Sequence, residues 1–184
     1  MAKQLIKKRV TLFSKVSKDV KRLYLSSFPK VERFPYLPLL LNAYRRDIEF
    51  IAYYDDDKFV GLSYIIFSKN FVFLLFLAVN PQYRNQSYGS RLLKTIKTSS
   101  NGRPVILAIE EMDKNADNYQ ERLNRLAFYE KNDYQLIPYF YYEMGEKYQL
   151  LSTCLDVDMG EFKKMLRKIS YGIIPIDIDL KVKT

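Results

Sequence analysis

The segment LAVNPQYRNQSYGSRLL, residues 77–93, decides the fold because an apolar run passes through it into an amphipathic helical pattern. Residues 71–79 are apolar without alternation, which indicates a strand that is buried on both faces, with helices above and below the sheet. Beyond Pro81, apolar side chains recur at helical spacing, at Tyr88, Leu92, Leu93 and Ile96. The segment therefore predicts a strand, a polar loop and the first turn of a helix in succession.

The connection between this strand and this helix is suited to binding an anion. The N–H groups in the first turn of a helix lack intrahelical partners and lie at the positive end of the helix dipole, so they bind phosphate oxygens. Gly89 has no side chain, which lets a phosphate approach the backbone closely. The alternative is an ordinary strand-to-helix connection, in which Gly89 only eases packing.

Patterns on both sides of this segment predict the other elements. We expect helices over residues 15–27, 37–46, 117–131 and 159–169, and strands over residues 50–54, 59–67, 105–109, 134–144 and 147–152. The helix after Pro81 should end at Asn101-Gly102, and the helix over 117–131 should direct Leu123, Leu126 and Ala127 inward. This order predicts an α/β (α+β) fold, a mixed central sheet flanked by helices on both faces.

No internal repeat, low-complexity stretch or Gly/Ser linker divides the chain. We therefore expect a single domain over residues 1–184, with a motif-bearing core at 15–153 and a C-terminal helix and tail at 154–184. The three consecutive aspartates at 55–57 lack the alternate spacing of a calcium loop, so we interpret them as a hairpin turn.

The composition excludes several kinds of chemistry. The 184 residues include no histidine, which removes Ser-His-Asp catalysis and every zinc site that needs a histidine ligand. Cys154, the single cysteine, cannot form an intrachain disulfide or a four-cysteine cluster, so we expect no metal site, an inert thiol and a cytoplasmic location. We read no signal peptide and no apolar run of about 20 residues, and therefore expect a soluble protein without a membrane partner.

Two motifs resemble those of the GNAT superfamily of N-acetyltransferases. Arg84-Asn85-Gln86-Ser87-Tyr88-Gly89 resembles the pyrophosphate loop Arg/Gln-x-x-Gly-x-Gly/Ala, with Ser87 in place of the first glycine. Phe128-Tyr129-Glu130-Lys131-Asn132-Asp133-Tyr134 resembles the helix end F-Y-E-K-x-G-F, with Asp133 in place of glycine. A side chain at Ser87 costs about 1 kcal/mol if that position prefers a glycine conformation, although serine can also cap a helix.

The resemblance covers residues 15–153. The segments Phe28-Pro29-x-x-Glu32-Arg33-x-Pro35, Ile109-Glu110 and Arg125-x-x-Phe128-Tyr129 resemble a little-characterised bacterial branch of the superfamily. The family's asparagine seven residues before the tyrosine is replaced by Arg122, and Asn124 is out of register, so we do not assign its cofactor contact.

The resemblance implies acetyl-CoA as cofactor, with its pantetheine between the strands that end at Val79 and Glu110. The N–H near Val79 would polarise the thioester carbonyl. The implied cofactor-binding residues are Leu77, Ala78, Val79, Arg84, Asn85, Gln86, Ser87, Tyr88, Gly89 and Ser90. Tyr129 lies where the family places its general acid, and a phenol of pKa about 10 can donate a proton to a thiolate leaving group. The alternative is that Tyr129 fills a half-buried face.

The attacking amine must lose its proton, and without histidine the carboxylates are the leading candidates for the base. Glu110 and Glu111 follow a buried strand, and because side chains alternate along a strand only one of them can point into the site. The resemblance favours Glu110. Glu32 is another base candidate or a contact for the substrate amine, unless it is simply a solvated loop charge. Arg33 and Arg125 could pair with these carboxylates.

These inferences point to an acetyl-CoA-dependent N-acetyltransferase in which a primary amine, of a small molecule or a peptide, attacks directly in a ternary complex. The acceptor pocket is expected from residues 28–46 and the final hairpin. The formal charge of +9 permits the alternative, a non-catalytic basic module that binds nucleic acid and retains the acyltransferase fold. No nucleic-acid motif supports that alternative. A longer acyl chain and a homodimer are also compatible with the sequence.

Overall fold

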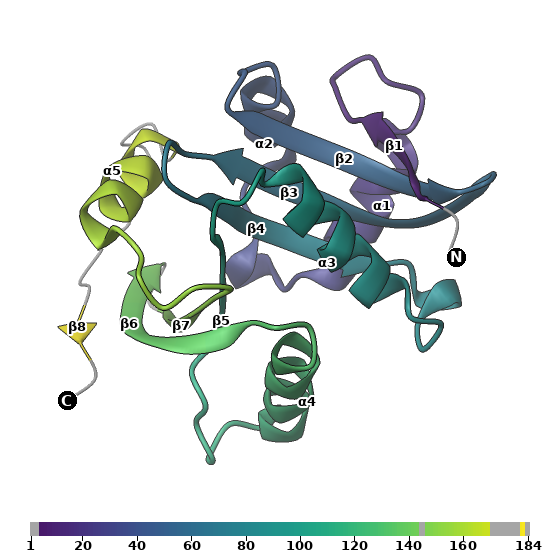
Figure 1. Ribbon diagram of the computed structural model, residues 1–184. Helices are drawn as coiled ribbons and strands as arrows, with labels where there is room; N and C mark the ends of the chain where they lie inside the picture. Colours follow the sequence, from purple (N-terminus) through teal and green to yellow (C-terminus); the bar gives the residue numbers. More distant parts are fainter. Residues whose placement is uncertain (1–3, 144–145, 170–180, 183–184) are drawn as a thin grey trace. The chain divides into compact units, whose positions relative to one another are not determined.

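The computed structural model describes residues 4–143, 146–169 and 181–182 (Figure 1). The chain forms two compact units. Unit 1 comprises residues 1–67 and 74–102, and unit 2 comprises residues 68–73 and 103–184. The strand β4 (Val72–Val79) begins in unit 2 and continues into unit 1. The two units are described separately below.

Unit 1 contains the strands β1 (Ile6–Arg9), β2 (Ile48–Asp55) and β3 (Lys58–Phe67), followed in the sheet by β4. The pairs β1–β2 and β2–β3 are antiparallel. The β2–β3 hairpin turns at the aspartates as expected, with Asp56 in the left-handed conformation at φ 52°.

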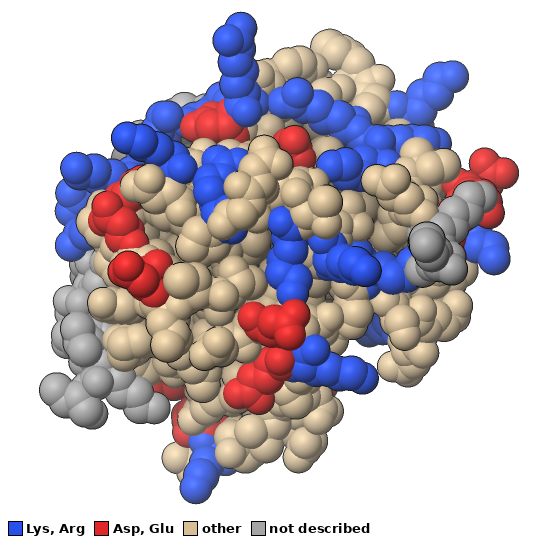
Figure 2. Space-filling view, in the orientation of Figure 1, with Lys and Arg blue, Asp and Glu red and all other residues tan. Residues whose placement is uncertain are grey.

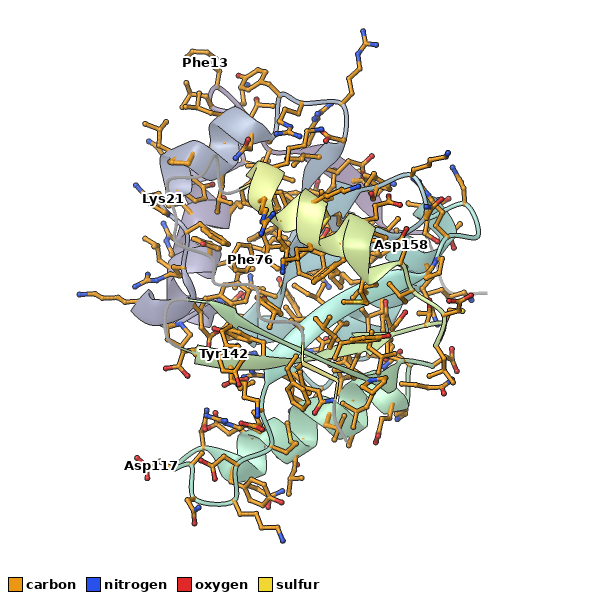
Figure 3. The ribbon with its side chains drawn as sticks, turned by 90° about the vertical axis from the view of Figure 1, so that its left-hand side faces the viewer. Phe13, Lys21, Phe76, Asp117, Tyr142 and Asp158 are labelled. Carbon is orange, nitrogen blue, oxygen red and sulfur yellow. The ribbon has the colours of Figure 1, made fainter. Side chains whose placement is uncertain are left out.

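Helices cover both faces of the unit 1 strands, as predicted. Figure 1 shows α3 (Tyr88–Ser99) in front of these strands and α1 (Ser17–Ser27) and α2 (Tyr36–Asn42) behind them. Behind the strands, Phe76 lies 5.1 Å from Tyr24 and 4.8 Å from Phe28 between ring centroids. Figure 3 shows Phe76 among the interior side chains, whereas Phe13 extends from the surface.

The face of the strands that α3 covers has its own buried cluster. This cluster contains Leu5, Ile51, Tyr53, Val60, Tyr88 and Leu92. Helix α3 approaches β3 closely at Gly61, where an added Cβ would lie 2.4 Å from the Ala78 carbonyl oxygen and 3.1 Å from a Leu92 methyl carbon. Gly61 therefore permits the packing of β3 against both β4 and α3.

Unit 2 contains the strands β5 (Val105–Glu110), β6 (Gln135–Glu143), β7 (Glu146–Ser152) and β8 (Lys181–Val182). Their order is β5-β7-β6-β8, and each neighbouring pair is antiparallel. The β6–β7 register shifts between Leu136 and Phe140, a stretch that includes Pro138, which has no N–H for the ladder.

Two helices complete unit 2, α4 (Tyr119–Glu130) and α5 (Met159–Ile169). Phe162 of α5 is buried, and its ring lies 5.1 Å from that of Phe73. The Glu161 carboxylate accepts hydrogen bonds from the N–H groups of Lys69 and Asn70 and from the Ser68 hydroxyl, and these bonds lower the pKa of Glu161. Helix α5 is thereby tied to the segment 68–73.

The predicted helices and strands are confirmed, with shifts at their ends, as is the α/β class with helices on both faces. The sequence analysis did not predict β1, β8 or the 3₁₀ turns η1 (Lys30–Glu32) and η2 (Pro81–Tyr83). All four residues of β1 are exposed at the sheet edge, so this strand has no apolar alternation to detect. Met144, the end of the predicted strand 134–144, lies outside the described residues.

Three structural expectations were wrong in part. The helix expected over 37–46 ends at Asn42, and turns follow. Ala127 is exposed instead of buried, since α4 turns a half-buried face that includes Leu123 and Leu126 toward the rest of unit 2. The strand β4 is buried on both faces only over its first residues, and from Leu75 onward every second residue is half-buried. Its last residues therefore keep accessible apolar surface.

Candidate active site

The loop after β4 is attached to the beginning of β3. The Asn80 N–H donates to the Val60 carbonyl at 2.9 Å, and its side-chain amide donates to the Phe59 carbonyl at 2.9 Å. The Asn80 side-chain oxygen accepts from the Gln82 N–H at 3.3 Å, which shapes the turn η2. These three bonds determine where the chain leaves the sheet.

Beyond η2 the loop is exposed and adopts two left-handed residues. Arg84, Asn85, Gln86 and Ser87 are all exposed, and the Gln86 side-chain amide donates to the Gln82 carbonyl at 3.3 Å. Asn85 and Ser87 have φ values of 60° and 61°. For a residue with a Cβ, this conformation costs about 1–2 kcal/mol, less for asparagine.

Ser87 does not use the capping ability that a serine offers at the start of a helix. Ser87 occupies the N-cap position of α3, but its side chain makes no capping hydrogen bond there. The left-handed backbone at Ser87 explains the difference, because capping serines hold the extended conformation. The same backbone supports the view that this position prefers glycine.

The first turn of α3 presents backbone donors. The helical ladder begins with the Arg91 N–H, which donates to the Ser87 carbonyl at 3.1 Å, so the N–H groups of Tyr88, Gly89 and Ser90 precede it. The first turn contains no acidic residue, and Gly89 and Ser90 are half-buried. Several N–H donors at the positive end of a helix dipole are the donor set that a diphosphate requires.

The remaining residues of the predicted cofactor site in unit 1 contribute backbone more than side chain. The Tyr88 side chain is buried in the cluster under α3, so its N–H is the group available to a ligand. Leu77 and Val79 are half-buried and pack against the same cluster, and Ala78 is buried. The exposed cation of this loop is Arg84.

The surface around α3 is basic. Figure 2 shows the face on which α3 lies, with Lys and Arg side chains across it. The helix itself contributes Lys94 and Lys97, together with Arg91, whose charge is paired with Asp55. Positive charge near the loop favours a polyanionic ligand such as a nucleotide.

Unit 1 also contains a cavity of about 630 Å³ beside the loop. The helix α1, the β2–β3 turn and η2 line it with the side chains of Asp19, Arg22, Leu23, Ser26, Asp57, Lys58, Phe59, Asn80, Pro81, Gln82 and Tyr83. Of these residues, Asn80 and the turn η2 adjoin the predicted cofactor site, and the others lie on α1, in the β2–β3 turn and at the start of β3. Glu32 lies in η1 of unit 1 and is half-buried.

In unit 2 the predicted carboxylate and its predicted cation come together. The Glu110 side chain is 10% exposed, and its carboxylate forms an ion pair with Arg125 of α4. The other carboxylate oxygen accepts from the Asn118 side-chain amide at 3.2 Å. Arg33 instead donates to the Leu25 carbonyl at 3.1 Å. The expected partnership is therefore confirmed for Arg125.

Glu111 is held differently from Glu110. Its side chain is 38% exposed and pairs with Lys147. The alternation expected along a strand separates the two carboxylates, and each has its own cation.

Tyr129 lies on α4 one turn after Arg125. Burial raises the pKa of its phenol to about 12, and the nearby Arg125 cation opposes this shift. Its ring lies 5.8 Å from that of Tyr134 in an edge-to-face contact. A phenol with this pKa keeps its proton throughout the neutral range and can act as a proton donor.

A polar network holds the start of α4, and the sequence analysis did not identify it. Arg122 donates to the Asn118 side-chain oxygen at 2.8 Å and to the Glu111 carbonyl at 2.6 Å. Asn118 in turn donates to Glu110. The signal was present as an Asn118–Arg122 pair four residues apart, the spacing at which helical side chains meet.

Asp133, the second residue that stands where the resemblance has glycine, also has a left-handed backbone, with φ 65°. Both departures from the family motifs, Ser87 and Asp133, therefore retain the conformation that glycine adopts most easily. The backbone of each motif persists although its glycine does not.

In the part of the chain that the structure describes, no three His, Cys, Asp or Glu side chains are grouped so as to hold a metal ion. None of the helices within the described ranges is long and apolar enough to cross a membrane.

Comparisons with known proteins agree with this geometry. Residues 46–136 match the family model described as an acetyltransferase (GNAT) domain. No curated protein matches the chain. A solved structure from Bacteroides thetaiotaomicron, assigned to the GNAT family, is 22% identical with a TM-score of 0.70, and the alignment covers 91% of this chain and 97% of that one.

Two other solved structures share the fold. An aminoglycoside 6′-N-acetyltransferase in complex with coenzyme A is 18% identical, with a TM-score of 0.61 over 83% of this chain and 98% of that one. The ribosomal-protein-S18-alanine N-acetyltransferase of Escherichia coli is 15% identical, with a TM-score of 0.57 over 83% of this chain and 96% of that one. With its loop, its helix end and its matched domain, this chain belongs to the GNAT family of acetyltransferases.

Proposed function

We propose that the protein is an acetyl-CoA-dependent N-acetyltransferase that transfers the acetyl group to a primary amine of a small molecule or a peptide by direct attack in a ternary complex. The observation that carries the proposal is the first turn of α3, whose backbone donors follow an exposed loop with two left-handed residues. Acetyl-CoA is the cofactor of the family, and it supplies an acetyl thioester.

In this proposal the N–H groups of Tyr88, Gly89 and Ser90 bind the diphosphate, together with the Arg84 cation. The helix dipole and the basic side chains of α3 favour the same anion. The N–H near Val79 orients the thioester by donating to its carbonyl oxygen. The hydrogen bonds to the diphosphate and to the thioester come from backbone N–H groups, which explains how the site tolerates a serine in place of the first glycine.

Tyr129 holds a proton on its Oη and donates it to the sulfur that leaves. A pKa of about 12 means that the phenol is protonated throughout the neutral pH range. Arg125, one turn earlier, limits the rise in this pKa and keeps the phenol a usable acid.

Glu110 accepts a proton from the acceptor amine or holds the ammonium group in place. Its carboxylate is bound by Arg125 and Asn118, which fixes its orientation. Glu32 in unit 1 is the alternative base. The two candidates lie on different elements, so single glutamine substitutions distinguish them.

A thermal-shift titration with acetyl-CoA, followed by a screen of amines, tests the proposal. A ligand at 100 times its Kd stabilises a native protein by about 2.7 kcal/mol, so the melting temperature should rise with acetyl-CoA concentration. Coenzyme A release with a subset of amines should follow. No shift at millimolar acetyl-CoA, together with salt-sensitive retention of oligonucleotides, would instead support the nucleic-acid-binding alternative.

A further inference from the structure

Asp55 ends β2 at the hairpin turn and reaches the first turn of α3. Its carboxylate accepts a hydrogen bond from the Tyr88 hydroxyl at 2.9 Å and from the Arg91 guanidinium at 2.8 Å. Tyr88 is the first residue of α3, and Arg91 contributes the N–H that begins the helical ladder. The two partners of Asp55 therefore lie on either side of Gly89 and Ser90.

The three groups form a shielded cluster. The Asp55 and Arg91 side chains are 19% and 23% exposed, and the Tyr88 residue is 9% exposed. The Arg91 guanidinium lies 4.9 Å from the centre of the Tyr88 ring. The bond to Asp55 raises the pKa of Tyr88, so its hydroxyl remains a donor in the neutral range. At this exposure the ion pair is less screened than a pair on the open surface.

The start of α3 needs an external attachment. Ser87 makes no capping bond, and both Ser87 and Asn85 hold a conformation that residues with a Cβ rarely adopt. Such a conformation persists only where surrounding contacts impose it. The ligand-facing part of the loop is exposed, so the contacts that impose it come from the buried side, where Tyr88 and Arg91 are attached to Asp55.

We propose that Asp55 is a positioning residue for the diphosphate site, because it fixes both ends of the α3 turn whose N–H groups bind the cofactor. This inference rests on the proposed function. Asp55 does not contact the cofactor in this scheme, and its negative charge near an anion is offset by the Arg91 cation with which it pairs. The aspartate that the sequence analysis placed in a hairpin turn thus serves the loop of another element.

The first measurement is the Kd of coenzyme A for Asp55→Asn, by calorimetry. Asparagine keeps the shape of the side chain but removes the charge. If the α3 turn loses its position, one N–H hydrogen bond to the charged diphosphate should be lost, which corresponds to about a tenfold weaker Kd for coenzyme A. The affinity for acetyl-pantetheine, which lacks the nucleotide diphosphate, should not change. An unchanged Kd for coenzyme A, or equal losses for both ligands, would overturn the proposal.

Asp47→Asn is the matched control. Asp47 lies just before β2, and Asp55 is the last residue of this strand. Asp47 accepts two hydrogen bonds from Arg45, of 2.9 and 2.7 Å, and the side chains of Asp47 and Arg45 are 33% and 23% exposed. This variant should lose comparable stability without losing affinity for coenzyme A. A similar loss of affinity in both variants would show that any ion pair at β2 has this effect, and would contradict a specific role of Asp55.

Hydrogen exchange separates this inference from the proposed function, and a double variant tests its mechanism. Hydrogen exchange of the amides at residues 85–91 should be several-fold faster in Asp55→Asn than in the unaltered protein, without any ligand. If the unaltered protein binds no coenzyme A, the proposed function fails, and exchange rates still decide whether Asp55 orders the loop. Adding Ser87→Gly to Asp55→Asn should recover most of the affinity because glycine relieves the strained residue, and no recovery would count against the mechanism.

Discussion

The two helices that carry the proposed site differ in how much side chain they bury and in the charge of their first turn. Helix α3 buries Tyr88, Leu92, Leu93 and Ile96, and its first turn contains no acidic residue. Helix α4 buries none of its side chains completely and has Glu121 in its first turn. The first helix is held by its apolar face and has backbone N–H donors at its start. The second is held by polar side chains at its start and by a half-buried face, and it carries the phenol of Tyr129.

This difference indicates where each helix is sensitive to mutation. A site made of backbone N–H groups depends on what can approach the backbone, so added bulk should damage it most. A site made of side chains depends on their chemical groups, so the removal of a single atom should damage it. The predictions below follow this contrast, from the largest effect to the smallest.

The largest effect is expected from Gly89→Trp. A bulky side chain at this position blocks the approach of the diphosphate, and the loss of two hydrogen bonds to a charged group corresponds to about a 100-fold weaker Kd for coenzyme A. Gly89→Ala, which suits a helix, is the control and should bind more tightly than the tryptophan variant. Calorimetry measures the affinities, and circular dichroism checks the fold. Unchanged affinity in a folded Gly89→Trp protein would exclude the loop as the cofactor site.

Tyr129→Phe should lower kcat by about 100-fold, the range of general acid catalysis, and leave the Kd for coenzyme A nearly unchanged. Tyr119→Phe, at the beginning of the same helix, is the control. Because the phenol has a pKa of about 12, its ionisation should cause no loss of activity as the pH rises from 7 to 10. Equal turnover in Tyr129→Phe would remove this residue from the mechanism.

Glu110→Gln should lower kcat/KM for the amine by about 100-fold, the lower end of general base catalysis, since glutamine cannot accept a proton and breaks the pair with Arg125. Glu111→Gln is the matched control, because Glu111 follows Glu110 in the chain and pairs with a different cation. Steady-state kinetics at several pH values measure the difference. A larger effect of Glu32→Gln than of Glu110→Gln would move the base to unit 1.

The smallest effects are expected at the two left-handed residues. Ser87→Gly should raise the free energy of unfolding by about 1 kcal/mol, because glycine adopts positive φ without steric cost. Asp133→Gly should give a smaller gain, since aspartate tolerates this conformation better than serine. Urea denaturation measures both. A loss of stability in Ser87→Gly would show that the loop is not strained there.

Much of the fold could be predicted from the sequence because buried helices and strands have apolar residues at characteristic spacing. The nearly continuous apolar run of β4 and the helical stripe of α3 identify the strand, the loop and the helix that form the proposed cofactor site. β1 has no such spacing, because it is exposed along its whole length, and its place in the sheet depends on pairing with β2. Pairing between distant segments has no local signal.

The candidate site also has one part that could be predicted from local sequence and another part that depends on packing. The segment 84–90 and the helix end 128–134 resemble GNAT motifs closely enough to propose the site, because a motif consists of residue types that are adjacent in the chain. The choice of Arg125 for Glu110 was one option among several in the sequence, since ion pairs depend on positions that only packing sets. The Asn118–Arg122 network was missed for the same reason.

By itself the sequence determined which chemistry is available, because a chain without histidine must rely on backbone amides, carboxylates and tyrosines. It also determined where the loop and its helix lie, because short-range periodicity encodes them. Only the tertiary structure decided that Asp55 holds the first turn of α3 and that burial and Arg125 together set the pKa of Tyr129. The Asp55 contacts join residues that are remote in sequence, and the pKa of Tyr129 depends on shielding from water. Neither the contacts nor the shielding exists until the chain has folded.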